Sequence, residues 1–360
     1  ERDSATGSWR RVVIKHPDPY KGPEARAHKE RLLDVEARAL EVLGYIPQVC
    51  SLLAQGRVGV GPGSFRYLVI EWAGGQPVAE MIHRAAQDGK TLPLGTTLVI
   101  ISQLAHVLSE AHRKGIINND VDVKHLYWHD ASAGGTGSGL LRVIDWGNAK
   151  TTSGSDWGTF GFRNDLEQFA DAMFSILTGR SSLGASGAGE EARPSFWQEG
   201  MRDTWARFDR FQAIRAPTQV GTALSRVGAR LCASTGGYPS ATSLYKDLAD
   251  CVRGLGDYLR DYLGQVDALL AQGANDGSEN PASLDRAQVV LRELCEVAPG
   301  DSGVQAKVAQ LERIRREREE STALRLGIAY VKAGNWLNAV EVLSRAFGHQ
   351  ADAGKSDPRL

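Results

Sequence analysis

The chain has 360 residues, of which 42% are hydrophobic and 24% are charged, and its formal net charge is −1. This composition is that of a globular protein long enough for two or three domains. The balanced charge gives no long-range attraction for nucleic acid or for an anionic membrane surface, so we expect neither partner. We find no apolar run of the roughly 20 residues that a membrane-spanning helix needs, and no signal peptide.

The four cysteines contain no Cys-x-x-Cys pair; they are Cys50, Cys232, Cys251 and Cys295. We therefore expect reduced thiols in the core of a cytoplasmic protein, and neither a disulfide framework nor a zinc site. The sequence begins at Glu1 without Met, which we interpret as a fragment of a longer protein.

The first 75 residues predict a strand, a helix and two more strands. Residues 9–17 are rich in β-branched side chains and stop at Pro17. Residues 24–44 carry an apolar stripe of helical period that ends at Gly44. Residues 48–75 predict two antiparallel strands around a glycine-rich turn.

Helices dominate the next part of the chain. Residues 92–115 predict a long amphipathic helix, followed by short strands in "GII", "HLYW" and "LLRVI". Residues 163–180 predict a helix that Asn164 or Asp165 can cap. Further helices are expected at 196–212, 217–233 and 240–253.

The last hundred residues predict paired helices. Residues 322–347 read as two helices joined by a Gly-Asn turn, and 283–314 have a related pattern broken at Pro299. Antiparallel helix pairs that recur along a chain are typical of solenoids. This region resembles tetratricopeptide repeats, which implies either a partner-binding surface or support for the rest of the fold.

A lysine at a strand end and a glutamate in the following helix are the first candidates for chemistry. Lys15 ends "VVIK", and Glu36 lies in the 24–44 helix. A lysine held by a helix glutamate can grip phosphate oxygens. A lone strand-end lysine is more often a solvated side chain, so this motif alone decides nothing.

Two aspartates follow neighbouring apolar segments farther along. Asp120, Lys124 and His125 lie in "NNDVDVKHLYW", and Asp145 lies in "VIDWG". Asp120 can accept a hydroxyl proton, Lys124 can neutralise phosphoryl charge, and His125 can face a metal. Asp145 suits Mg²⁺, which takes one or two carboxylates together with phosphate oxygens. Each aspartate alone is most simply a turn residue, but their order after Lys15 and Glu36 favours a shared site.

The strand "RYLVIEWAGGQPV" leads through Glu71 and Ala73 into a Gly-Gly turn. Its backbone can form a hinge that meets the edge of an adenine ring. An ordinary core strand fits these residues equally well.

Taken together, these motifs resemble the protein-kinase-like fold, in its bacterial serine/threonine kinase branch, over residues 1–253. "VVIK" resembles the third-strand lysine motif, "GIINNDVDVKHLYW" the catalytic loop, and "IDWG" the metal-binding Asp-Phe-Gly. "GTFGF" at 158–162 is similar to part of the activation segment, and Asp165 to a buried acid of the large lobe.

The resemblance implies an α+β, two-lobed domain followed by an all-α helical-repeat region. The expected domains are a small lobe at 1–75, lacking its first strands and glycine-rich loop, a large lobe at 76–253, and tetratricopeptide-like repeats at 254–360. ATP and Mg²⁺ or Mn²⁺ are the implied cofactors, and a protein substrate or regulatory protein is the implied partner.

The same resemblance implies a role for each candidate residue. Lys15, Glu36, Glu71 and Ala73 would bind the nucleotide. Asp120 and Lys124 would act in catalysis, and Asp145 and His125 would hold the metal.

The chain departs from the family at several positions. Asn118 and Asn119 replace the family's His-Arg, His125 replaces its metal-binding Asn, and Tyr238 replaces an Arg before the last helix. The segment from Asp145 to Asp165 is short and lacks Ala-Pro-Glu. Three functions therefore remain open: a protein serine/threonine kinase, a catalytically impaired pseudokinase scaffold, and a small-molecule phosphotransferase.

Overall fold

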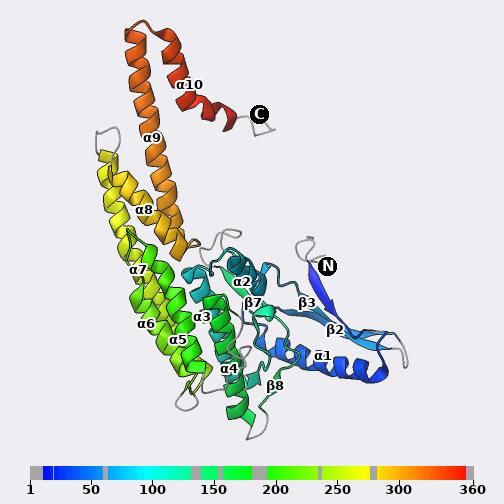
Figure 1. The fold of residues 1–360 in the computed structure, drawn as a ribbon. Helices are drawn as coiled ribbons and strands as arrows, with labels where there is room; N and C mark the ends of the chain where they lie inside the picture. Colours follow the sequence, from blue (N-terminus) through cyan, green and yellow to red (C-terminus); the bar gives the residue numbers. More distant parts are fainter. Residues whose placement is uncertain are drawn as a thin grey trace. The chain divides into compact units, whose positions relative to one another are not determined.

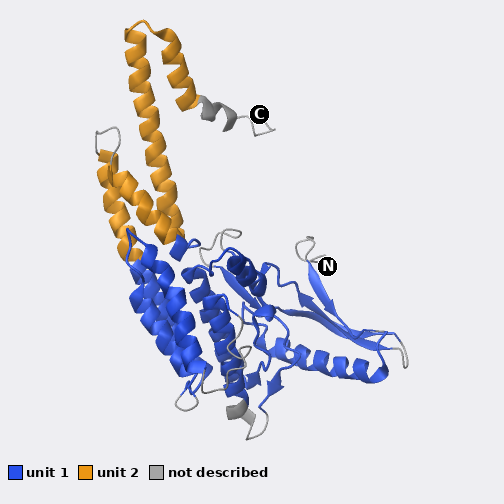
Figure 2. Ribbon diagram, in the orientation of Figure 1, with its two compact units in different colours: residues 1–258, 296–301 blue, residues 259–295, 302–360 orange. Residues whose placement is uncertain are grey.

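The computed structural model describes residues 11–18, 20–59, 64–130, 139–152, 157–180, 193–233, 237–275 and 282–353, without the side chains of 157–160 and 348–353. The chain forms two compact units (Figure 2). Unit 1 comprises Glu1–Tyr258 and Glu296–Asp301, and unit 2 comprises Leu259–Cys295 and Ser302–Leu360.

Unit 1 begins with a small antiparallel sheet and one helix (Figure 1). Strand β3 (Phe65–Glu71) lies between β1 (Val12–Lys15) and β2 (Leu52–Val58). Helix α1 (Pro23–Leu43) contacts β2 and β3. Proline at its first turn suits a position whose N–H has no helical partner. These elements confirm the strand, helix, strand and strand order predicted from the sequence.

Helix α1 buries one stripe of side chains, which are Leu33, Glu36, Ala37, Leu40 and Leu43. The spacing of three or four residues places them on one face. Glu36 is a carboxylate in an otherwise apolar stripe, and it is only 2% exposed. A buried carboxylate requires a partner, which the site described below provides.

Two long helices and three short strand pairs follow. Helices α2 (Val78–Gln87) and α3 (Leu94–Arg113) precede β5 (Ile116–Ile117). A second sheet has three strands in the order β4 (Gln76–Pro77), β6 (Leu126–His129) and β7 (Leu140–Val143). Strand β5 pairs separately with β8 (Lys150–Thr151). These antiparallel pairs bring the loops after β5 and β7 to neighbouring positions, as their register shows.

By length and composition alone, α3 could cross a membrane, which the sequence analysis did not foresee. Its 18-residue window has a mean hydropathy of 1.3, but 61% of that window is buried inside the structure. A core helix that is apolar on all sides shows both properties.

The large helical part of unit 1 continues with α4 (Trp157–Thr178), α5 (Arg193–Ala206) and α6 (Thr218–Leu231). Residues 158–162, which resemble part of the activation segment, belong to helix α4 in the structure. Gly161 lies where α4 contacts β5. A Cβ there would lie 2.2 Å from Ile117 Cδ1, so glycine lets α4 pack closely on β5.

The C-terminal helices depart from the predicted helix pairs. Helix α7 (Ala241–Asn275) does not end at residue 253, and α9 (Ser302–Lys332) is one helix of 31 residues. The first part of α9 follows α8 (Ala282–Val297) in the pair predicted at 283–314, and its last part precedes α10 (Trp336–Ala353) in the pair predicted at 322–347. The two predicted pairs therefore share one helix. Two separate tetratricopeptide-like repeats are not established. The predicted turn between α9 and α10 is confirmed, and Gly334 adopts a positive φ of 74° there.

Helices α9 and α10 lie side by side (Figure 1) and leave apolar side chains exposed. The largest exposed fractions belong to Trp336, Leu337 and Val340, at 64%, 85% and 63%. In contrast, the neighbouring Ala339 is 2% exposed, and Gly327 of α9 approaches Leu343 of α10 closely.

This difference between neighbouring residues gives a testable prediction. Ala339→Asp should destabilise the α9–α10 pair by roughly 2–4 kcal/mol, because it buries a carboxylate without a partner. Val340→Asp, the matched control, should change stability by less than about 0.5 kcal/mol. Hydrogen exchange of the α10 amides measures both effects; equal exchange in the two variants would contradict the packing described.

All four cysteines are free thiols, and Cys50, Cys232 and Cys251 are buried. Burial raises the pKa of each of these three thiols to about 11. The expectation of reduced core cysteines is confirmed for these three, and Cys295 is partly exposed.

Candidate active site

Lys15 stands at the centre of two ion pairs in unit 1. Its Nζ lies 2.6 Å from Glu36 Oε1 and 3.3 Å from Asp145 Oδ1. Burial alone would lower the pKa of Lys15, but the charges and hydrogen bonds of Glu36 and then Asp145 outweigh it and raise the pKa. The lysine is therefore charged at neutral pH, and it is the ion-pair partner that the buried Glu36 carboxylate of α1 requires.

Asp145 occupies a strained turn just after β7. Its φ is 65°, a left-handed conformation that is uncommon outside glycine and that is found disproportionately at functional sites. Burial raises the pKa of the Asp145 carboxyl, but Lys15 and then His125 outweigh that effect and lower the pKa. The carboxylate is ionised and 39% exposed, so a ligand can reach it.

The loop carrying Asp120 is fixed to α4 by a fully buried aspartate. Asp165 is 0% exposed, as the sequence predicted. Its carboxylate accepts hydrogen bonds from the backbone N–H groups of Asn118 (2.9 Å) and Asn119 (2.7 Å) and from His112 Nε2 (2.8 Å). Asn119 is left-handed, with a φ of 61°. The buried acid therefore stabilises a strained turn next to Asp120.

His125 lies between the two candidate aspartates. It ends the short 3₁₀ helix Val123–His125, and its Nδ1 lies 3.1 Å from the carbonyl oxygen of Asp120. Because that carbonyl can only accept, Nδ1 carries the proton in this bond. In the neutral ring Nε2 then keeps its lone pair, and it lies 3.7 Å from Asp145 Oδ2.

Lys124 was expected from the sequence to neutralise phosphoryl charge, but in this structure its side chain is paired with Asp122. Its Nζ pairs with Asp122 Oδ2 at 3.2 Å, and the side chain is 59% exposed. The hydrogen bond and charge of Asp122 raise the pKa of Lys124, with smaller contributions from Asp120 and Asp145.

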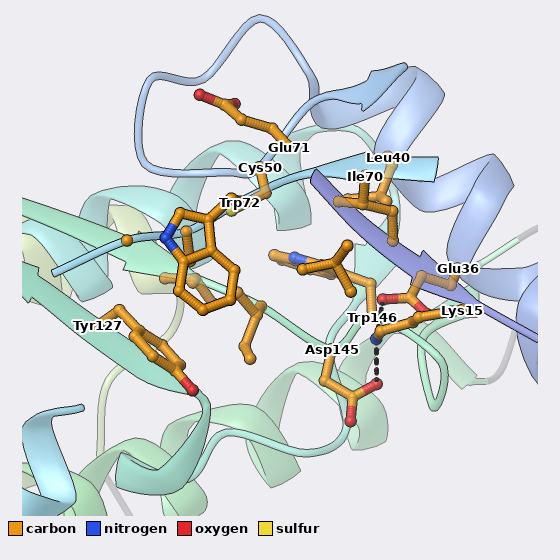
Figure 3. A pocket seen from close by; sticks show the side chains of 15 residues that line it. Lys15, Glu36, Leu40, Cys50, Ile70, Glu71, Trp72, Tyr127, Asp145 and Trp146 are labelled. Atoms are coloured by element: carbon orange, nitrogen blue, oxygen red, sulfur yellow. Dashed lines mark hydrogen bonds and ion pairs between the residues drawn. The ribbon is translucent and has the colours of Figure 1, made fainter. Parts of the chain in front are cut away.

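At the two predicted hinge residues, the Glu71 carboxylate and the Ala73 carbonyl oxygen are engaged within the protein. Glu71 pairs with Arg142 Nη2 at 2.8 Å and accepts a hydrogen bond from Ser51 N–H at 3.1 Å. The carbonyl oxygen of Ala73 accepts a hydrogen bond from His129 Nε2. The side chain of Glu71 points away from the cavity in Figure 3, so any contact there falls to the backbone.

A pocket that is partly open to solvent adjoins Lys15 and Asp145. Figure 3 shows Trp72 and Tyr127 at one end and the polar trio of Lys15, Glu36 and Asp145 at the other. Trp146, which is fully buried, lines it as well. One apolar end and one charged end fit an elongated ligand with a flat ring and an anionic group.

Sequence reasoning missed four residues of this region, which are Trp72, Tyr127, His129 and Asn148. Tyr127 and His129 alternate with the buried Leu126 and Trp128 along β6. This period of two indicates that Tyr127 and His129 share the opposite face of the strand. For Asn148, whose Nδ2 donates to Asp120 Oδ2 at 2.9 Å, no sequence pattern revealed the contact.

The predicted metal residues fit a cation that takes further ligands from its substrate. Within the described ranges, no three His, Cys, Asp or Glu side chains form a metal-holding group. Mg²⁺ needs only one or two carboxylates when phosphates and water supply the rest. The ionised Asp145 meets that requirement, whereas the imidazole of His125 is a type of ligand that suits other metals better than Mg²⁺ or Mn²⁺.

Three comparisons with known proteins were made. No family model matches the chain. The chain is 29% identical over 90 residues to a protein described as "Serine/threonine-protein kinases drp72" from Corynebacterium efficiens. The match covers 25% of this chain and spans 15% of the relative's length.

Among solved structures, the chain is similar to the Rad53 kinase domain with SCD2, with a TM-score of 0.43 and 15% identity. The similarity covers 68% of this chain and 81% of the other. The short sequence match to a serine/threonine kinase supports a protein-kinase-like fold.

Proposed function

We propose that the chain binds ATP with Mg²⁺ or Mn²⁺ and transfers the terminal phosphoryl group to a hydroxyl of a protein. The observation that carries this proposal is Lys15, which pairs with both Glu36 and Asp145 at the charged end of an apolar cavity. A lysine so placed can bind phosphate oxygens, while the apolar end receives the base.

Each residue then has a defined task. Lys15, oriented by Glu36, would hold phosphate oxygens, and the backbone at Glu71 and Ala73 would face the base. Asp145, with His125, would hold the metal ion, which supplies charge neutralisation at the phosphates. Such catalysis is mainly positioning and electrostatics, which a rigid ion-paired cluster provides.

Asp120 would orient the acceptor hydroxyl and take its proton. The acceptor oxygen forms a bond to the terminal phosphorus, and the bond from that phosphorus to the ADP oxygen breaks. ADP leaves with the electron pair, and the hydroxyl proton passes to Asp120. Lys124 would add positive charge near the transferred group after leaving Asp122, from which the structure shows it 3.2 Å away.

A pseudokinase scaffold is the second candidate, and the geometry around α4 favours it. Because α4 begins at Trp157, few residues separate it from Asp145, and little chain remains to seat a peptide. The exposed Trp336, Leu337 and Val340 suit a protein partner. The same short segment is compatible with a small-molecule acceptor, which is the third candidate.

We also propose a cytoplasmic location. The four cysteines are free thiols, as expected where thiols are kept reduced.

The decisive experiment compares the chain with its Asp120→Ala variant. ATP with Mg²⁺ or Mn²⁺ should raise the thermal midpoint of both proteins, because Asp120 acts on the acceptor and ligand binding stabilises by mass action. Transfer of labelled phosphate to a protein substrate should fall by about 10²–10⁴-fold in the variant. Asp88→Ala, which removes an exposed carboxylate after α2, is the matched control and should retain activity.

The outcomes separate the three functions. Binding without transfer by either protein supports the pseudokinase, and transfer to an amino alcohol or amino sugar but not to protein supports the small-molecule enzyme. Absence of any nucleotide binding contradicts all enzymatic candidates.

A further inference from the structure

Asn148 joins the two segments that carry the candidate aspartates. It lies three residues after Asp145, and its Nδ2 donates a hydrogen bond of 2.9 Å to Asp120 Oδ2. Asn148 is exposed, and Gly147 and Ala149 on either side of it are buried. An exposed asparagine with its amide directed at a carboxylate needs an explanation other than core packing.

The backbone of Asp120 is already fixed without Asn148. Its N–H donates to Asn118 Oδ1 at 3.1 Å, and its carbonyl oxygen accepts from His125 Nδ1 at 3.1 Å. The next residue, Val121, donates its N–H to Gln168 Oε1 of α4 at 2.8 Å. These contacts set where the residue lies, but they leave the rotation of its carboxylate open.

Other charged neighbours do not set that rotation. Lys124 is engaged by Asp122 at 3.2 Å, and His125 Nδ1 lies 3.9 Å from Asp120 Oδ2, beyond hydrogen-bond range. The amide of Asn148 is therefore the short contact that the structure shows on this carboxylate. A neutral donor leaves the negative charge in place, whereas a lysine would partly cancel it.

We propose that Asn148 is a positioning residue, which holds Oδ2 of Asp120 so that Oδ1 faces the acceptor hydroxyl. Because Asn148 follows Asp145 on the same segment, the bond also couples the proton acceptor to the candidate metal site. This inference rests on the proposed function.

Kinetics with one protein substrate test the proposal. Asn148→Ala should lower kcat by about 10- to 100-fold, as expected for one hydrogen bond to a charged group, while the KM for ATP and the thermal shift with ATP stay unchanged. Asn148→Gln keeps an amide donor and should recover part of the loss. Asn148→Asp places a like charge beside Asp120 and should be less active than Asn148→Ala. Thr151→Ala, exposed on the same segment, is the control.

A double-mutant cycle separates positioning from general damage. In an Asp120→Asn background, Asn148→Ala should lower the residual rate less than twofold, because the carboxylate it serves is absent. An equal loss in both backgrounds, or a kcat of Asn148→Ala within about twofold of wild type, would overturn the inference.

Failure of the proposed function gives a different result. If the wild type transfers no phosphate to any acceptor, the proposed function is wrong and Asn148 has no catalytic role to support. The contact itself is then decided by the side-chain amide resonances of Asn148, which should move when Asp120 is replaced by Asn. Resonances that do not move show that the bond is not formed in solution.

Discussion

Replacing Lys15 with methionine is expected to abolish phosphoryl transfer and to lower the free energy of unfolding by about 3–5 kcal/mol. The stability loss follows because Glu36, whose side chain is 3% exposed, would keep its charge in the core without a partner. Activity would be lost because methionine offers no positive charge to the phosphates. Denaturant unfolding and labelled phosphate transfer measure the two effects.

The double variant Lys15→Met with Glu36→Leu separates stability from chemistry. Removing both charges leaves an apolar pair of suitable size, and such replacements are often neutral or stabilising. We expect the double variant to regain most of the lost stability while remaining inactive and unresponsive to ATP. Lys21→Met, at an exposed lysine before α1, is the control and should change neither property.

Two results would contradict this account. Full nucleotide binding by Lys15→Met would show that the lysine does not hold the phosphates. A double variant as unstable as Lys15→Met alone would show that the buried charge of Glu36 is not the cause of the stability loss.

The residues that sequence reasoning placed together are those whose signal is local. Lys15 ends a β-branched strand, Glu36 belongs to a helical stripe, and Asp145 stands between a strand and Gly147; each is read from its neighbours alone. Their order along the chain, combined with a family resemblance, was enough to predict that they converge, and the structure brings them within hydrogen-bond or ion-pair distance.

The contacts that were missed depend on tertiary packing. The bonds from Asn148 to Asp120 and from His129 to Ala73 join segments 28 and 56 residues apart. Nothing in the spacing of these residues distinguishes them from ordinary loop and strand positions. The close approach of Gly161 in α4 to Ile117 in β5 is of the same kind, because it also joins segments that are far apart in the sequence.

The length of α9 was predictable and was nevertheless missed. Residues 313–320, "RIRREREE", contain neither glycine nor proline and are strong helix formers. Read by propensity alone, they join the two helices that were expected as separate units. The paired-helix pattern on either side of these residues predicts two separate units, whereas their own helix propensity predicts the single continuous helix that the structure shows.

Replacing the buried Asp165 with alanine should destabilise the fold at least as much as the loss of Lys15. Two backbone N–H groups, of Asn118 and Asn119, and the ring of His112 would lose their acceptor. Each unsatisfied buried group costs about 1–3 kcal/mol, so the loss of three acceptor contacts should lower the free energy of unfolding by roughly 3–9 kcal/mol.

Asp165→Asn should also lower the free energy of unfolding, but by less than Asp165→Ala does. An asparagine keeps one acceptor oxygen, but its NH₂ group would face one of the N–H donors that the carboxylate now accepts. Glu167→Ala, two residues farther along α4, removes an exposed partner of Arg163 and should cost less than about 0.5 kcal/mol. Denaturant unfolding of the three variants gives the ranking directly.

The same substitutions should act on the site through the turn at Asn119. A left-handed asparagine is strained by about 1–3 kcal/mol and persists only while its surroundings impose it. When Asp165 no longer holds the two N–H groups, the turn should relax and carry Asp120 out of position. Transfer by any surviving folded Asp165→Asn should therefore fall in kcat while ATP binding at Lys15 is kept. A variant that loses ATP binding to the same extent as kcat would show instead that Asp165 supports the whole cavity.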